Sequence, residues 1–98
     1  MDVGTDVDPS LYPNITALFR VGFRGIEAHV GRRRFRVTIY EALHDRRPPV
    51  FSTNYEEEIE ILIDGELRPL YVKADLPWAA ADSIDECLRA ALHHVNVA

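Results

Sequence analysis

The spacing of apolar residues changes once along the chain, at Ser83. Between residues 19 and 72 apolar side chains recur at every second position, which is typical of strands with one buried face. After Ser83 they recur at spacings of three and four, which is typical of a helix with one apolar stripe. Packing that helix on the sheet buries both apolar surfaces. The sequence therefore predicts an α+β fold, in which an antiparallel sheet of about four strands, built as hairpins, packs against one C-terminal helix.

The length of 98 residues fits one domain with one modest core. Residues 1–14 hold three Asp and two Pro without an apolar period, so we expect a flexible N-terminal tail there. The single domain is then expected over residues 15–98. Cys87 is the only cysteine, which excludes a disulfide within the chain.

Two glycine-containing turns define the expected hairpins. The alternation over 19–23 slips by one position before 26–30, and Gly25 at the slip predicts a β-bulge. Gly31-Arg32 predicts a two-residue turn into a strand over 34–40. Asp64-Gly65 predicts a second hairpin, with Pro69 marking an edge strand. This hairpin collects the apolar side chains of Ile59, Ile61, Ile63, Leu70, Val72 and Ala74 on one face, which we expect to bury.

The helix is expected to begin after Ser83. Ser83 and Glu86 have the spacing of a capping box, in which each side chain binds a free amide of the first turn. The apolar stripe that follows consists of Ile84, Cys87, Leu88, Ala91, Leu92 and Val95. This stretch, Asp82-Ser83-Ile84-Asp85-Glu86-Cys87-Leu88-Arg89-Ala90-Ala91-Leu92 after an edge strand, resembles the helix of small bacterial HicB-type antitoxins, although the Pro-Gly-Cys-like stretch that precedes the helix in those proteins is absent here. The resemblance implies a toxin-neutralising form of protein binding.

Arginines gather in one part of an acidic chain. The net charge is −5, yet residues 20–47 hold eight arginines against three acidic residues. Such a surface could bind the phosphates of a nucleic acid. Alternatively, the arginines could pair with the glutamates of the next strand, Arg34 and Arg36 with Glu58 and Glu60, which a pI of about 5.2 favours. The candidate nucleic-acid surface consists of Arg32, Arg33, Arg34 and Arg36.

A second candidate surface is aromatic. Trp78 follows Pro77 and could either close one end of the core or remain half exposed beside the edge strand. In the second case it would form an apolar patch for a protein partner. The candidate protein-interaction surface consists of Pro69, Tyr71 and Trp78.

Other reactive residue types do not assemble into a site. Glu56, Glu58 and Glu60 share one side of a strand without a converging His or Asp, and we interpret them as a solvated strand that resists edge pairing. Cys87 belongs to the apolar stripe, which predicts a buried, unreactive thiol. His93 and His94 diverge on the helix. We therefore expect no enzyme, no cofactor and no metal.

Function is predicted only as a ranked pair. The acidic start lacks a secretory signal, and no apolar run is long enough to cross a membrane, so we expect a cytoplasmic protein. The first hypothesis is a small protein-interaction module that binds another protein or itself. The alternative is nucleic-acid binding through the arginine-rich hairpin.

Overall fold

The structure is a computed structural model that describes residues 8–43, 47 and 49–98. Within these residues it has one sheet of six strands and one α-helix, the α+β fold expected, with more strands than the four predicted. The elements are a 3₁₀ turn (Pro9–Leu11), β1 (Ala17–Arg20), β2 (Gly25–Val30), β3 (Arg33–Leu43), β4 (Val50–Ile63), β5 (Glu66–Lys73), β6 (Ala80–Ala81) and α1 (Ile84–Asn96).

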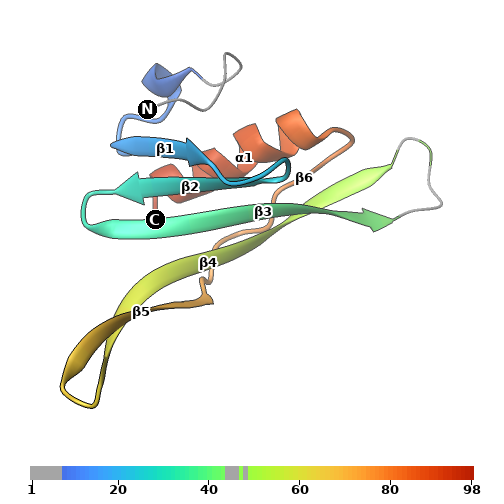
Figure 1. The fold of residues 1–98 in the computed structure, drawn as a ribbon. Coiled ribbons are helices and arrows are strands. Elements are labelled where there is room, and N and C mark those ends of the chain that lie inside the picture. Colours follow the sequence, from blue (N-terminus) through green and yellow to red (C-terminus); the bar gives the residue numbers. More distant parts are fainter. Residues whose placement is uncertain (1–7, 44–46, 48) are drawn as a thin grey trace.

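The sheet is an antiparallel meander. Strands β1 to β5 lie in chain order, and β6 pairs with β4 beside Phe51 and Ser52 (Figure 1). The predicted register of the first arginine-rich hairpin is confirmed, since Ala28 lies opposite Phe35 and Val30 opposite Arg33 across a turn in which Gly31 has φ +62°. Local side-chain alternation and turn chemistry were sufficient to determine this pairing.

The phase slip near Gly25 is a hairpin turn, so the predicted bulge is wrong. Arg20 pairs with Ile26, and the chain reverses through Val21 to Arg24 with Gly22 at φ +71°. Both a bulge and a four-residue turn shift the alternation, so the pattern alone could not separate them. At Gly25 a Cβ atom would lie 2.4 Å from the carbonyl oxygen of Val21, which explains the need for glycine.

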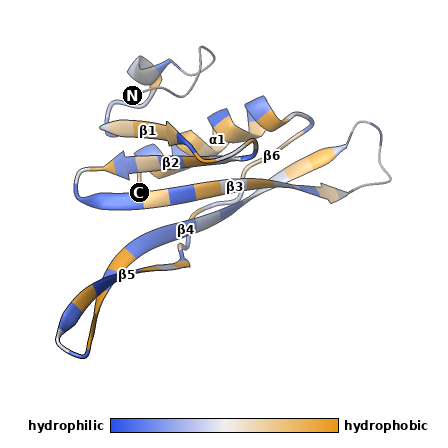
Figure 2. Cartoon of the chain, viewed as in Figure 1, coloured by the Kyte–Doolittle hydropathy of each residue, from blue (hydrophilic) through white to orange (hydrophobic). Residues whose placement is uncertain are grey.

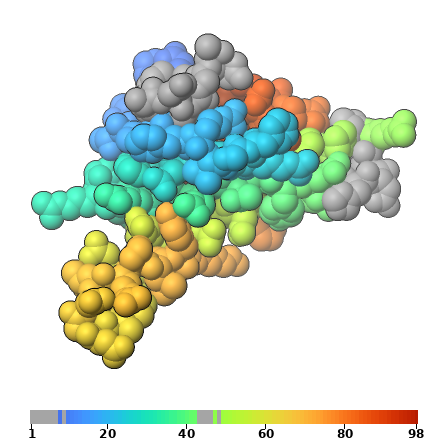
Figure 3. Space-filling model, in the orientation of Figure 1, coloured from blue at the N-terminus to red at the C-terminus, as the bar shows by residue number. Residues whose placement is uncertain are grey.

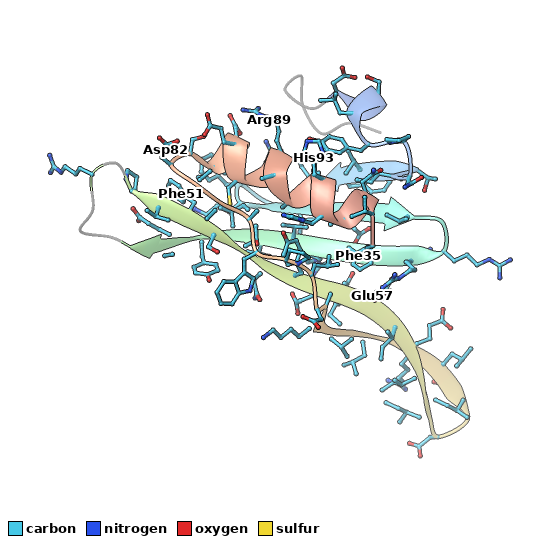
Figure 4. All side chains as sticks on the ribbon, turned by 180° about the vertical axis from the view of Figure 1, so that it is seen from behind. Phe35, Phe51, Glu57, Asp82, Arg89 and His93 are labelled. Carbon is cyan, nitrogen blue, oxygen red and sulfur yellow. The ribbon has the colours of Figure 1, made fainter. Side chains whose placement is uncertain are left out.

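The core lies between α1 and one face of the sheet. Ser83 caps the helix by accepting a hydrogen bond from the Glu86 amide at 3.2 Å, which confirms the serine half of the predicted capping box. The helix packs on β2, β3, β4 and β6, and Figure 4 shows Phe35 between helix and sheet. The buried apolar residues are Tyr12, Leu18, Ile26, Ala28, Phe35, Val37, Ile39, Tyr55, Ala79, Cys87, Leu88, Ala91, Leu92 and Val95.

The structured part begins before residue 15, where the domain was expected to start. Tyr12 is 1% exposed, donates a hydrogen bond to the carbonyl oxygen of Arg89 at 3.2 Å, and stacks on His93. Asn14 exchanges two hydrogen bonds with Asn96 at the end of α1. Residues 8–14 therefore dock on the helix, while residues 1–7 of the predicted tail lie outside the described residues.

The second hairpin leaves the body of the molecule. Its turn is as predicted, because Asp64 and Gly65 have φ of +50° and +79°, and Ile61 lies opposite Arg68 and Ile59 opposite Leu70. However, β3 pairs with β4 only as far as Glu58. Residues 59–70 thus form a two-stranded ribbon, called the arm below, that projects from the remainder (Figures 1 and 3).

The lengths of β4 and α1 explain the arm. A helix of 13 residues spans about 20 Å, whereas a strand of 14 residues spans about 46 Å, so the helix covers less than half of β4. The radius of gyration of 14.3 Å exceeds the value of about 13 Å for a compact domain of 100 residues. The expectation that the isoleucine face buries is therefore wrong for the arm, where Ile59 and Ile63 are 38% and 42% exposed.

Candidate interaction surfaces

The arginine-rich hairpin is paired with the glutamates of β4. Arg33 donates two hydrogen bonds to the Glu57 carboxylate, at 2.8 and 2.9 Å, and Arg34 approaches Glu58 at 3.5 Å. The Arg33 contact holds the pKa of Glu57 below its usual value. Three of the four candidate nucleic-acid residues thus carry neutralising or hydrogen-bonding partners. Arg32 alone has neither in the described part of the chain.

Arg36 is held by a different group from the one expected. It lies opposite Glu56 in the register, and its guanidinium lies over the Tyr71 ring at 4.1 Å from the centroid. It donates a hydrogen bond to the Tyr71 hydroxyl at 3.0 Å and lies 3.8 Å from Glu27. Tyr71 in turn donates to Glu27 at 3.3 Å. These contacts join β2, β3 and β5 on the sheet face opposite α1, at the base of the arm.

The pairing corrects one interpretation of the glutamates. Glu56, Glu58 and Glu60 do share a face, but β4 is an interior strand with β3 and β5 on its two sides. Their charge is therefore part of a cross-strand network and does not protect an edge. Among residues 8–43, 47 and 49–98 no three His, Cys, Asp or Glu side chains gather where they could hold a metal ion.

The three residues of the predicted aromatic patch lie in different surroundings. Pro69 is exposed on β5, which is an edge strand as its proline indicated. The Tyr71 hydroxyl is engaged with Arg36 and Glu27. Trp78 is 79% exposed in the loop before β6, so it does not close the core. It borders a shallow pocket with Lys73, Asp75 and Leu76.

A groove of about 680 Å³ lies at the opposite end of the sheet. It is bounded by the β1–β2 turn, the start of β4 and the first residues of α1, and its lining is mostly apolar. Phe23 stands at its border with 78% exposure, and Figure 4 shows Phe51 and Asp82 near this end of the helix. The aromatic exposure here is concentrated in one side chain of a turn.

The arm carries the densest exposed apolar surface in the described part of the chain. Of twelve exposed large hydrophobic residues, five fall within its twelve positions. Figure 2 shows these apolar stretches along the far end of β4 and β5. Sequence reasoning found the alternation but expected burial, so it missed this surface. The five residues are Ile59, Leu62, Ile63, Leu67 and Leu70.

The two faces of the arm differ. Ile59, Ile61, Ile63, Leu70 and Val72 share the face that continues from the helix-covered side of the sheet, which we call the isoleucine face. Leu62 and Leu67 pair on the opposite face, next to Pro69 and the charged residues Glu58 and Glu60. A two-stranded ribbon is only marginally stable in water unless a third strand or another layer covers it. The arm therefore has a surface that calls for a covering partner.

Cys87 is buried as predicted. Its thiol is 3.7 Å from the carbonyl oxygen of Ala79, and burial raises its pKa above the usual value. A raised pKa keeps the thiol protonated and unreactive at neutral pH. No helix in the described residues is long and apolar enough to cross a membrane.

Comparison with protein-family models, with curated proteins and with solved structures finds no match for this chain. The functional argument therefore rests on the surfaces described above. The arm is the surface with the largest unmet demand for burial.

Proposed function

We propose that this protein is a protein-interaction module and that the arm, residues 59–70, is its binding element. The observation that carries the proposal is the exposure of aliphatic side chains on a two-stranded ribbon beyond the helix: Leu62 is 69% and Leu67 is 66% exposed. Contiguous apolar patches of this kind mark binding sites on folded proteins. Isolated exposed side chains such as Phe23 do not carry the same inference.

The size of the arm sets the expected affinity. Burying a Val, Leu, Ile or Phe side chain contributes about 1.5 to 3 kcal/mol, so covering the exposed fractions of Ile59, Leu62, Ile63, Leu67 and Leu70 contributes about 4 to 8 kcal/mol. Association costs about 4 kcal/mol or more in lost freedom. We therefore expect a weak complex unless the partner adds contacts outside the arm.

The arginine-rich hairpin supports this ranking. Arg33 and Arg34 are already paired with glutamates, and Arg36 is held by Tyr71, which leaves less unpaired positive charge for phosphates. The contacts of Arg36 with Tyr71 also fasten β5 to β3 at the base of the arm. We infer that these arginines hold the arm in place for binding.

The test compares capture of proteins by the immobilised chain and by variants. The arm variant Leu62→Ser/Leu67→Ser/Leu70→Ser should lose the proteins that the parent retains, including any copies of the chain itself. Phe23→Ser and Trp78→Ser remove equally exposed side chains outside the arm and should retain them. Circular dichroism establishes that each variant is folded.

The outcome that contradicts the proposal is equally specific. If the arm variant retains every partner, the arm is not the binding element. If Trp78→Ser alone abolishes capture, the binding surface is the loop before β6, next to Lys73 and Asp75.

A further inference from the structure

The isoleucine face of the arm lacks the second layer that covers the rest of the same sheet face. Over the body, α1 packs on β2, β3 and β4, but beyond Glu58 this face carries Ile59, Ile63 and Leu70 at 38%, 42% and 43% exposure. Two amphipathic sheets pack stably face to face at about 10 Å. A second arm is an element of matching length and matching apolar pattern.

Edge-to-edge addition to β5 is the less favourable way to cover the arm. Pro69 lies in the middle of this edge strand and has no N–H to donate, so a strand added there would have an interrupted ladder. Edge prolines are one of the devices by which sheets avoid such pairing. Packing through side chains on the isoleucine face does not need this donor.

Charge complementarity favours a second copy placed tip to base. The tip of the arm carries Asp64 and Glu66, and the base on the same face is bordered by Arg33, whose side chain is 49% exposed while it binds Glu57. Two arms packed in opposite directions bring each acidic tip to the partner's Arg33. Two arms packed in the same direction would instead place acidic tip against acidic tip, which is repulsive.

We propose that the occupant of the isoleucine face is a second copy of this chain, packed tip to base about a two-fold axis. The proposal rests on the proposed function, since it names the partner of the same arm. A two-fold contact uses the same patch on both copies and closes the assembly at a dimer. Near the axis Arg68 lies on the same face, where its own Glu66 neutralises it at 3.2 Å. The area of one arm face is small for a stable interface, so the dimer should be weak.

The experiment is sedimentation velocity of the full chain across a range of about 1 μM to 1 mM, where complexes of modest affinity dissociate. The parent should shift from monomer to dimer within this range. Leu70→Ser removes an interfacial side chain twice per dimer and should raise the dissociation constant about 10- to 100-fold. Leu67→Ser makes the same chemical change on the opposite face and should change it less than about twofold.

The tip-to-base arrangement has its own readout. Mild oxidation of a mixture of the Glu66→Cys and Arg33→Cys variants should give a disulfide-linked heterodimer, while native Cys87 is buried and does not react. A disulfide-linked homodimer of Glu66→Cys alone would show that the tips meet and would overturn the arrangement.

The remaining outcomes separate this inference from the proposed function. A chain that stays monomeric at every concentration overturns the self-association, and the proposed function survives if another protein is still captured through the arm. Equal effects of Leu70→Ser and Leu67→Ser overturn packing through the isoleucine face. A monomer that captures no protein through the arm overturns both.

Discussion

Truncating one leucine in the core and one in the arm tests the division of the molecule into a covered body and an exposed arm. Leu92 on α1 is 0% exposed, whereas Leu62 on the arm is 69% exposed. Leu92→Ala removes buried methyl groups and leaves a cavity, which costs about 2 to 5 kcal/mol. Leu62→Ala removes groups that are mostly hydrated already, so we expect a change in the free energy of unfolding within about 0.5 kcal/mol.

The difference is large compared with the total stability of a domain, which is about 5 to 15 kcal/mol. For a domain of this size each kcal/mol shifts the midpoint of thermal unfolding by about 4 to 8 °C, so Leu92→Ala should lower it by roughly 10 to 30 °C. Leu62→Ala should leave it within a few degrees. Circular dichroism during heating and in urea measures both, at a low protein concentration that excludes self-association.

The reasoning is refuted if Leu62→Ala lowers stability as much as Leu92→Ala does. Equal losses would mean that the arm packs against the body in the folded monomer. Unchanged dependence on urea concentration in both variants is the control, because it shows that each still exposes the same surface on unfolding.

Three further predictions follow from single residues. Gly25→Ala places a Cβ atom 2.4 Å from the Val21 carbonyl oxygen, so it should destabilise the chain by about 1 to 3 kcal/mol in urea unfolding; an unchanged midpoint would contradict the close approach. Arg33 lowers the pKa of Glu57, so this pair stabilises the fold above about pH 4.5 and its contribution is lost as the pH falls through the lowered pKa. Because Arg33 is half exposed, the loss should stay below about 1 kcal/mol and should be absent in Glu57→Gln, measured as the difference in unfolding free energy between pH 6 and pH 3. Trp78 is the only tryptophan and is 79% exposed, so its fluorescence should be quenched by iodide nearly as strongly as that of a free indole; a shielded, blue-shifted emission would contradict its position.

The features that the sequence determined by itself depend on neighbours in the chain. Asp64 and Gly65 adopt positive φ because a two-residue hairpin turn requires it, and this turn aligns Ile59 with Leu70. Ser83 caps the helix because the Glu86 amide needs an acceptor three residues away. The apolar stripe of α1 was readable for the same reason, since helical geometry is local.

The features that were missed depend on contacts between distant segments or on short irregular stretches. Tyr12 is buried because α1 offers its hydroxyl the carbonyl oxygen of Arg89, 77 positions away. The start of β4 was not recognised because Ser52, Thr53 and Asn54 interrupt the apolar alternation. Strand β6 has only two alanines and carries no pattern.

The arm shows most clearly what tertiary structure decided. The alternation through Ile59, Ile61 and Ile63 shows that one face of the strand is apolar, but it does not show what covers that face. Coverage depends on how far α1 reaches along β4, and a helix rises about 1.5 Å per residue where a strand rises about 3.3 Å. The helix therefore ends its coverage before the strand ends, and the same alternating pattern is buried near Tyr55 and exposed at Ile63.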